Sequence, residues 1–172
     1  IHVHDESEGK EYEADELLQH EDFDHKTLQN DVALIHVPED IEYDENTAPI
    51  KLPSRNESYV GKNYTISGFG HMGKDKPLAN TLQYTQLRVI PDQRCQRLYN
   101  HENFDGTKIC ALGRNGRSTC SGDSGGPLAN AAKNYQIGIV SFGKGSCDGR
   151  NPSGYTKVSR YVNWIKEKTG MN

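Results

Sequence analysis

The segment at residues 122–128 (GDSGGPL) places one serine, Ser124, among glycines and directly after an aspartate. A serine hydroxyl is an effective nucleophile only when a neighbouring base accepts its proton, and attack on a carbonyl creates an oxyanion that needs N–H donors. Glycines let the backbone turn sharply, so that amide N–H groups point at one spot. The segment therefore predicts acyl-transfer chemistry on Ser124. The alternative is a glycine-rich turn that follows a disulfide and has no chemistry.

The cysteines form an even set of four. They are Cys95, Cys110, Cys120 and Cys147. None of their spacings is Cys-x-x-Cys, which argues against a zinc or thioredoxin-type site and favours two disulfides formed in an oxidising compartment. Asn56 and Asn63 each begin an Asn-x-Ser/Thr sequon, so both are candidate glycosylation sites and point to the same compartment.

Composition narrows the class of protein further. In 172 residues, 33% are hydrophobic, and 17 glycines with 7 prolines favour turns over long helices. The net charge of −4 argues against a nucleic-acid partner, which requires a basic patch. No apolar run approaches the roughly 18 residues that span a bilayer, so no membrane segment is expected.

Short strand patterns recur around the serine motif. Strands are expected within residues 31–37, 64–66, 81–90 and 136–142, the third of which alternates apolar and polar side chains. Only residues 155–168 have the spacing of a helix, with Gly170 as its stop. The sequence therefore predicts an all-β protein with one C-terminal helix.

Further segments accompany the serine motif in a consistent order. They are residues 30–35 (NDVALI), 68–70 (GFG), 109–111 (ICA), 141–143 (SFG), 154–158 (GYTKV) and 164–165 (WI). Together with residues 122–128, they resemble the trypsin/chymotrypsin family of serine proteases, and most of all its invertebrate chymotrypsin-like members. The resemblance covers nearly the whole chain, with Phe69 standing where the family has tryptophan.

The resemblance implies a role for each matching residue. Ser124 would be the nucleophile, and Asp31 would orient the catalytic histidine and stabilise its protonated form. The N–H groups of Gly122 and Ser124 would form the oxyanion hole. Ser141 would donate a hydrogen bond to Asp31. Asp123 would be the activation switch, a buried carboxylate paired with the N-terminal ammonium that zymogen cleavage releases.

The same resemblance predicts the substrate site. Phe142 and Gly143, beside Ser141, would pair with the substrate backbone as an added strand. Ser118 would form the floor of the primary pocket, and a neutral serine there predicts no preference for Lys or Arg. Gly143 leaves one wall of the primary pocket open to a large ring, whereas Ser153 at the other wall would narrow the pocket. We expect chymotrypsin-like cleavage after Phe, Tyr or Leu, with an elastase-like or mixed preference as the alternative.

The family's architecture is two six-stranded antiparallel β-barrels with a C-terminal helix. In this chain residues 1–47 would be the remainder of the first barrel, which is incomplete, and residues 48–172 would form the second barrel and the helix. The implied disulfides are Cys95–Cys110 and Cys120–Cys147.

The family's catalytic histidine and its mature N-terminus have no counterpart here. None of the seven histidines lies in a Thr-Ala-Ala-His-Cys context. Three explanations are open: a partial sequence of a complete enzyme, one piece of a nicked protease held to the other piece, or a truncated homologue that acts as a binding module. In each case the chain by itself is expected to retain little hydrolytic activity.

The resemblance also implies location and partners. A secreted, extracellular monomer is expected, which acts on protein or peptide substrates, is bound by protein protease inhibitors, and associates with the missing N-terminal segment. No cofactor is expected. Calcium is the alternative, because residues 8–11 (EGKE) faintly resemble the calcium loop of trypsins, although the earlier ligand of that loop has no clear counterpart.

Overall fold

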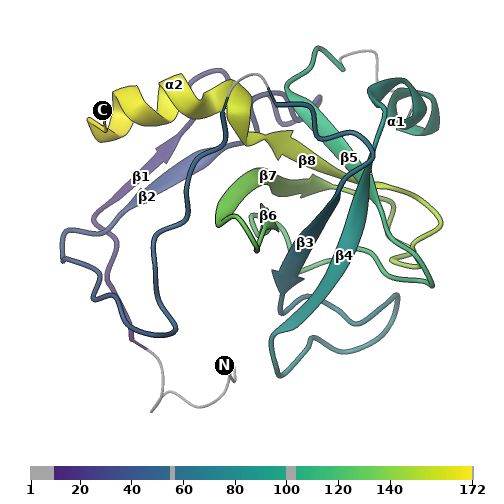
Figure 1. The fold of residues 1–172 in the computed structure, drawn as a ribbon, viewed down its shortest axis with the longest axis horizontal. Helices are drawn as coiled ribbons and strands as arrows, with labels where there is room; N and C mark the ends of the chain where they lie inside the picture. Colours follow the sequence, from purple (N-terminus) through teal and green to yellow (C-terminus); the bar gives the residue numbers. More distant parts are fainter. Residues whose placement is uncertain (1–9, 55–56, 100–103, 172) are drawn as a thin grey trace.

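The computed structural model describes residues 10–54, 57–99 and 104–171. Its main body is a closed antiparallel barrel in which each strand is hydrogen-bonded to the next (Figure 1). In order around the barrel, the strands are β3 (Asn63–Gly68), β4 (Gln83–Ile90), β5 (Lys108–Leu112), β8 (Ser153–Lys157), β7 (Tyr135–Phe142) and β6 (Pro127–Asn130). The four expected strands correspond to β3, β4 and β7 of this barrel and to one strand of the small sheet described next.

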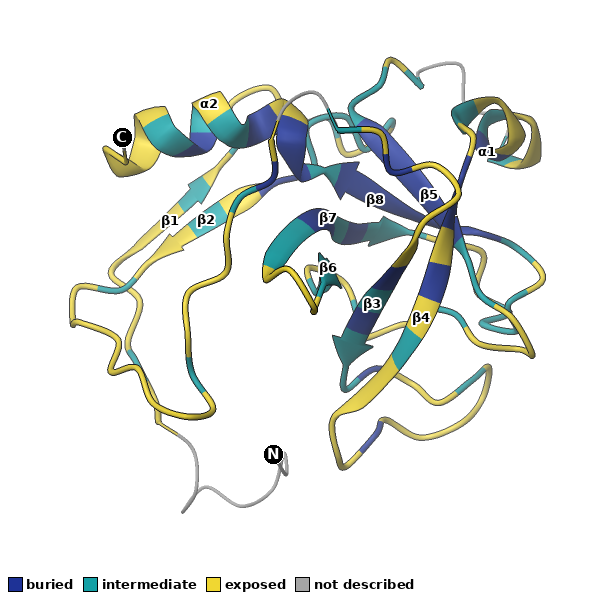
Figure 2. Cartoon of the chain, in the orientation of Figure 1, coloured by how far each residue is buried: buried dark blue, intermediate teal, exposed yellow. Residues whose placement is uncertain are grey.

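A two-stranded sheet stands beside the barrel, formed by β1 (Glu16–Gln19) and β2 (Ala33–His36). Leu17 pairs with Ile35 across it, and the two side chains are 74% and 68% exposed. Figure 2 shows this sheet mostly in the colours of exposed and intermediate residues, in contrast to the barrel. The expected fold is confirmed, with one complete barrel and an incomplete first unit. The division between residues 47 and 48 stays a prediction.

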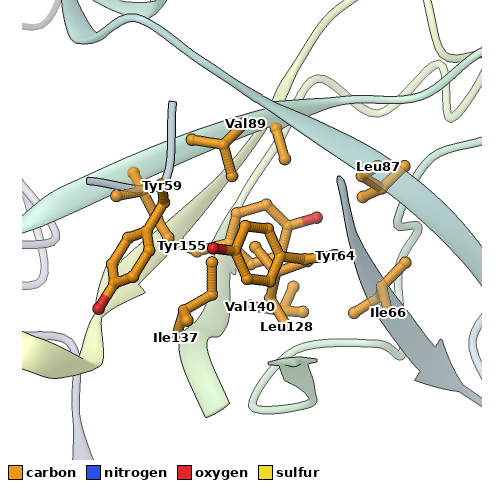
Figure 3. Close-up of a cluster of buried hydrophobic side chains, with 11 residues drawn as sticks. Tyr59, Tyr64, Ile66, Leu87, Val89, Leu128, Ile137, Val140 and Tyr155 are labelled. Atoms are coloured by element: carbon orange, nitrogen blue, oxygen red, sulfur yellow. The ribbon is translucent and has the colours of Figure 1, made fainter. Parts of the chain in front are cut away.

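The barrel interior is filled by apolar and aromatic side chains from all six strands (Figure 3). β4 shows why alternation identified it, because Leu87 and Val89 point inward and Arg88 between them is exposed. Leu128 of β6 is fully buried in the same cluster. A second cluster joins the small sheet to the barrel through Val32 and the C-terminal helix.

The helices differ from the expectation in two ways. The final helix, α2 (Val158–Thr169), ends at Gly170 as expected, where φ is +68°. It begins three residues later than expected, because residues 155–157 belong to strand β8 and are held by β5 and β7. A further helix, α1 (Asp92–Tyr99), was not expected at all, since Cys95 is its one buried residue and it has no continuous apolar face.

Both implied disulfides are present, Cys95–Cys110 and Cys120–Cys147. The first ties α1 to β5, and the second joins the turn before Ser124 to the loop after β7. Of the two sequons, Asn63 is exposed at the start of β3. Asn56 lies outside the described residues, as do Glu8 and Gly9 of the calcium-loop pattern. Within the described part of the chain, no helix has the length and apolar character to cross a membrane.

Replacing Leu128 with alanine is expected to lower the free energy of unfolding by about 3–5 kcal/mol, because a closed barrel cannot collapse around the cavity. Leu17→Ala is the matched control. Its side chain is 74% exposed, so the expected change is below about 0.5 kcal/mol. Urea denaturation of both variants measures the difference, and equal effects would mean that the barrel core is not packed as described.

Candidate active site

The segment that carries Ser124 is a tight turn between Cys120 and β6. The Asp123 N–H donates to the Cys120 carbonyl over 3.1 Å, and the Gly126 N–H donates to the Asp123 carbonyl over 2.9 Å. Gly122 has φ +92°, in the left-handed region. This conformation is unfavourable for any residue that has a Cβ atom. Ser124 itself is exposed. Among the described residues, no protein acceptor takes the N–H of Gly122 or of Ser124, so both donors are available to a ligand.

The carboxylate of Asp123 packs on the segment at residues 68–70. Its Oδ1 accepts from the Gly70 N–H and its Oδ2 from the Cys120 N–H, both over 2.9 Å. A Cβ built on Gly68 or Gly70 would lie within 2.5 Å of this carboxylate. The Gly-x-Gly pattern is therefore explained by the space that Asp123 needs. The carboxylate also borders a cavity of about 520 Å³, together with Ser118 and both glycines.

Gly70→Ala is expected to displace the Asp123 carboxylate and to lower the free energy of unfolding by about 1–3 kcal/mol, as overpacking does. Gly145→Ala is the matched control, because a Cβ there meets nothing within 4 Å. Urea unfolding compares the two variants. If both are as stable as the parent protein, the carboxylate does not occupy the position described.

Asp31 lies just before β2 and is held by side chains of the barrel. The Ser141 hydroxyl donates to its Oδ2 over 2.5 Å, and the Thr156 hydroxyl donates to its backbone carbonyl over 2.6 Å. Ser141 comes from β7 and Thr156 from β8, so the barrel fixes both the side chain and the backbone of this aspartate. The hydrogen bond from Ser141 is the one that the resemblance implies.

A smaller cavity, of about 120 Å³, lies next to Ser124. Ser124, Ser141, Phe142 and Gly143 all line it, so the structure brings these four predicted residues together. The others that line it are Thr119, Cys120, Ser121, Val140, Lys144, Gly145 and Cys147, none of which is acidic.

Two predicted pocket residues lie outside this lining. Ser118 donates to the Thr119 carbonyl over 3.0 Å and borders the larger cavity instead. Ser153 is buried, and the Thr119 hydroxyl donates to its Oγ over 2.5 Å. Thr119 therefore stands between Ser153 and the cavity. Sequence reasoning did not identify Thr119. The roles of Ser118 and Ser153 in specificity stay predictions.

Lys108 is a second residue that sequence reasoning missed. It is 3% exposed at the start of β5, and its ammonium lies 5.7 Å from the ring centroid of Phe142. Burial lowers the pKa of this lysine, while the charges of Asp105, Asp31 and Asp24 act in the opposite direction. Its sequence signal was a lysine directly before the apolar run at residues 109–112.

The histidines with described contacts are engaged away from the smaller cavity. The His20 ring stacks on Trp164, with centroids 4.9 Å apart. His36 lies against Asp15 at 2.5 Å, and the His71 ring is hydrogen-bonded to the Lys76 carbonyl. No described histidine lines the cavity with Ser124.

Comparison with known proteins agrees with this geometry. The trypsin family model matches residues 1–165. Collagenase from Hypoderma lineatum is 38% identical over 162 residues, and chymotrypsin-2 from Vespa crabro is 35% identical over 156. These matches cover 92% and 91% of this chain, but 61% and 69% of the relatives. The chain thus spans between three fifths and seven tenths of their length.

Solved structures of serine proteases are also similar to this chain. HL collagenase superposes with a TM-score of 0.85 at 37% identity, covering 92% of this chain and 69% of that one. Neuropsin, a serine protease expressed in the limbic system of mouse brain, superposes with a TM-score of 0.85 at 28% identity, covering 93% and 72%. With the matched family model, these likenesses show that the chain belongs to the trypsin family of serine proteases.

Proposed function

We propose that the native protein, meaning this chain with whatever segments accompany it, is a secreted serine endopeptidase that cleaves peptide bonds through an acyl-enzyme on Ser124. One observation carries the proposal. Ser141 donates to Asp31 and also lines the cavity that Ser124 borders, so it connects the predicted orienting carboxylate to the predicted nucleophile. The even disulfides and the exposed Asn63 sequon support secretion.

The proposed chemistry follows from these positions. A histidine outside this chain accepts the proton of the Ser124 hydroxyl while Oγ attacks the substrate carbonyl carbon. The free N–H groups of Gly122 and Ser124 bind the oxyanion. The histidine then gives its proton to the leaving amine, the C–N bond breaks, and an ester forms on Ser124. Water, activated by the same base, hydrolyses the ester. Asp31 stabilises the imidazolium in both steps.

Asp123 is the proposed activation residue. It receives two backbone hydrogen bonds, yet a carboxylate has more acceptor capacity than two donors fill. The larger cavity that it borders has room for the end of a chain. An ammonium released by cleavage would bind there and stabilise the turn that carries Gly122 and Ser124.

We propose cleavage after large apolar residues. Among the described residues, no acidic side chain lines the smaller cavity, and Val140, Phe142 and Gly143 give it apolar or unobstructed surfaces. A pocket without a carboxylate cannot compensate the charge of a buried Lys or Arg side chain. Peptides that differ only in the residue before the scissile bond test this point. The proposal requires Phe, Tyr and Leu to be favoured over Arg, Lys and Ala.

A fluorophosphonate probe tests the activity itself, because it reacts with an activated serine and not with an ordinary one. The native protein is treated with the probe and digested, and the adduct is located by mass spectrometry. An adduct on Ser124 together with peptide hydrolysis is the expected result. If Ser124 is unlabelled and no peptide is cleaved in the processed protein, the protein is instead a non-catalytic homologue that binds partners.

A further inference from the structure

The segment at residues 27–31, which leads to Asp31, has a backbone that needs outside support. Leu28 and Asn30 both have φ +54°, in the left-handed region, where residues with a Cβ are disfavoured. The segment belongs to no strand or helix. A conformation of this kind persists only when neighbouring groups fix it, and the barrel and α2 supply such groups.

Side chains from three elements bind this segment. The Lys108 ammonium donates to the Thr27 carbonyl over 2.7 Å, and the Thr107 hydroxyl lies 3.1 Å from the Gln29 Oε1. The Tyr161 hydroxyl from α2 donates to the Asn30 Oδ1 over 3.0 Å. Thr156 holds Asp31, as described above. Of these four contacts, only the one from Lys108 carries a charge.

Lys108 also contacts the substrate side of the site. Its ammonium lies below the ring of Phe142, which packs edge-on against Tyr99 with centroids 5.1 Å apart. Phe142 lines the smaller cavity, and Ser141 next to it donates to Asp31. A single buried cation therefore contacts both the segment that leads to Asp31 and the cavity wall.

We propose that Lys108 is a positioning residue of this active site, which fixes the segment at residues 27–31 and places a buried positive charge beside Asp31. The proposal rests on the proposed function, in which Asp31 orients a histidine base. The charged groups that face Lys108 are Asp24 and Asp31 from the segment before β2 and Asp105 from the loop before β5.

The effect of the Lys108 charge on the pH dependence of activity has a predictable direction. A base must be neutral to accept the proton of Ser124, so activity falls as the pH drops below the pKa of the base. A nearby cation disfavours the imidazolium and lowers that pKa. Removal of the cation therefore raises it, and the acid limb of kcat/KM moves to higher pH by about half a unit, given the high effective dielectric of such sites.

The test compares three variants of the native protein. Lys108→Met removes the charge and the hydrogen bond to Thr27. Lys108→Arg keeps the charge. Thr107→Val also leaves every charge in place, but it removes a hydroxyl that contacts Gln29 of the same segment and donates to Asp105. Two quantities are measured, the pH profile of kcat/KM and the hydrogen exchange of the amides at residues 27–31.

We expect Lys108→Met to speed exchange at residues 27–31 by about tenfold and to shift the acid limb upward. Lys108→Arg should leave the acid limb of kcat/KM where it is in the unmodified protein. Thr107→Val should speed exchange at residues 27–31 without shifting the acid limb. An unchanged limb and unchanged exchange in a folded Lys108→Met protein would overturn the proposal. Failure of the proposed function would give a different result. The unmodified protein would then neither hydrolyse peptides nor react with the fluorophosphonate probe at Ser124. In that case unchanged exchange alone still overturns the positioning role.

Discussion

Ser124→Ala is expected to lower kcat of the native protein by about 10⁵–10⁶-fold, because alanine has no oxygen with which to form the acyl-enzyme. Substrate binding should change little, since the cavity lining is otherwise intact. The measurement is initial-rate hydrolysis of a peptide with Phe before the scissile bond. The variant should also lose covalent labelling by the fluorophosphonate probe.

Ser121→Ala is the matched control for that prediction. Ser121 lines the same cavity and is exposed, as Ser124 is. Each substitution therefore removes one serine hydroxyl from the same surface. The control should keep kcat within about threefold of the parent value, in line with surface substitutions that touch no reacting atom. If Ser121→Ala were the inactive variant, the nucleophile would have been assigned to the wrong serine.

Asp31→Asn is expected to lower kcat by about 10⁴-fold while the fold is retained. Asparagine has the shape of aspartate, and its amide oxygen can still accept from Ser141. Its amide nitrogen, however, donates rather than accepts, so it favours the wrong tautomer of the histidine and does not stabilise the imidazolium. A pre-steady-state assay that follows acylation of Ser124 should locate the loss in that step.

Asp40→Asn serves as the control, since Asp40 is an exposed carboxylate at some distance along the chain. It should leave both kcat and the free energy of unfolding nearly unchanged. A loss in Asp31→Asn of less than tenfold would instead indicate that Asp31 is a structural residue held by Ser141 and Thr156, with no part in proton transfer.

Alternating burial made β4 predictable, whereas the start of the C-terminal helix was not predictable. In β4 one face meets the barrel core, and the period of two is visible in the sequence. In β8 four of the five residues are buried, so no alternation separates the strand from the apolar positions of α2 that follow. α1 gives no long apolar stripe because Cys95, bonded to Cys110, and Tyr99, packed on Phe142, attach this short helix to the barrel.

The candidate site was predictable in so far as it depends on local motifs. The turn around Ser124 needs glycines for its backbone, and the segment at residues 68–70 needs them to admit Asp123, so both leave a signature in the sequence. Contacts between distant segments leave none. Lys108 is far along the chain from Thr27 and Asp31, and its position beside them follows only from the pairing of β5 with β8.

The Cys120–Cys147 disulfide closes a covalent ring that contains Ser124, Ser141, Phe142 and Gly143. A single backbone cut inside that ring, for example in the exposed turn at residues 131–134 between β6 and β7, would leave both ends of the break attached to one molecule. The cut protein would keep its mass, apart from one added water, until a reductant opened the bond. Damage to this half of the site is therefore invisible on a non-reducing gel and appears as two bands on a reducing one.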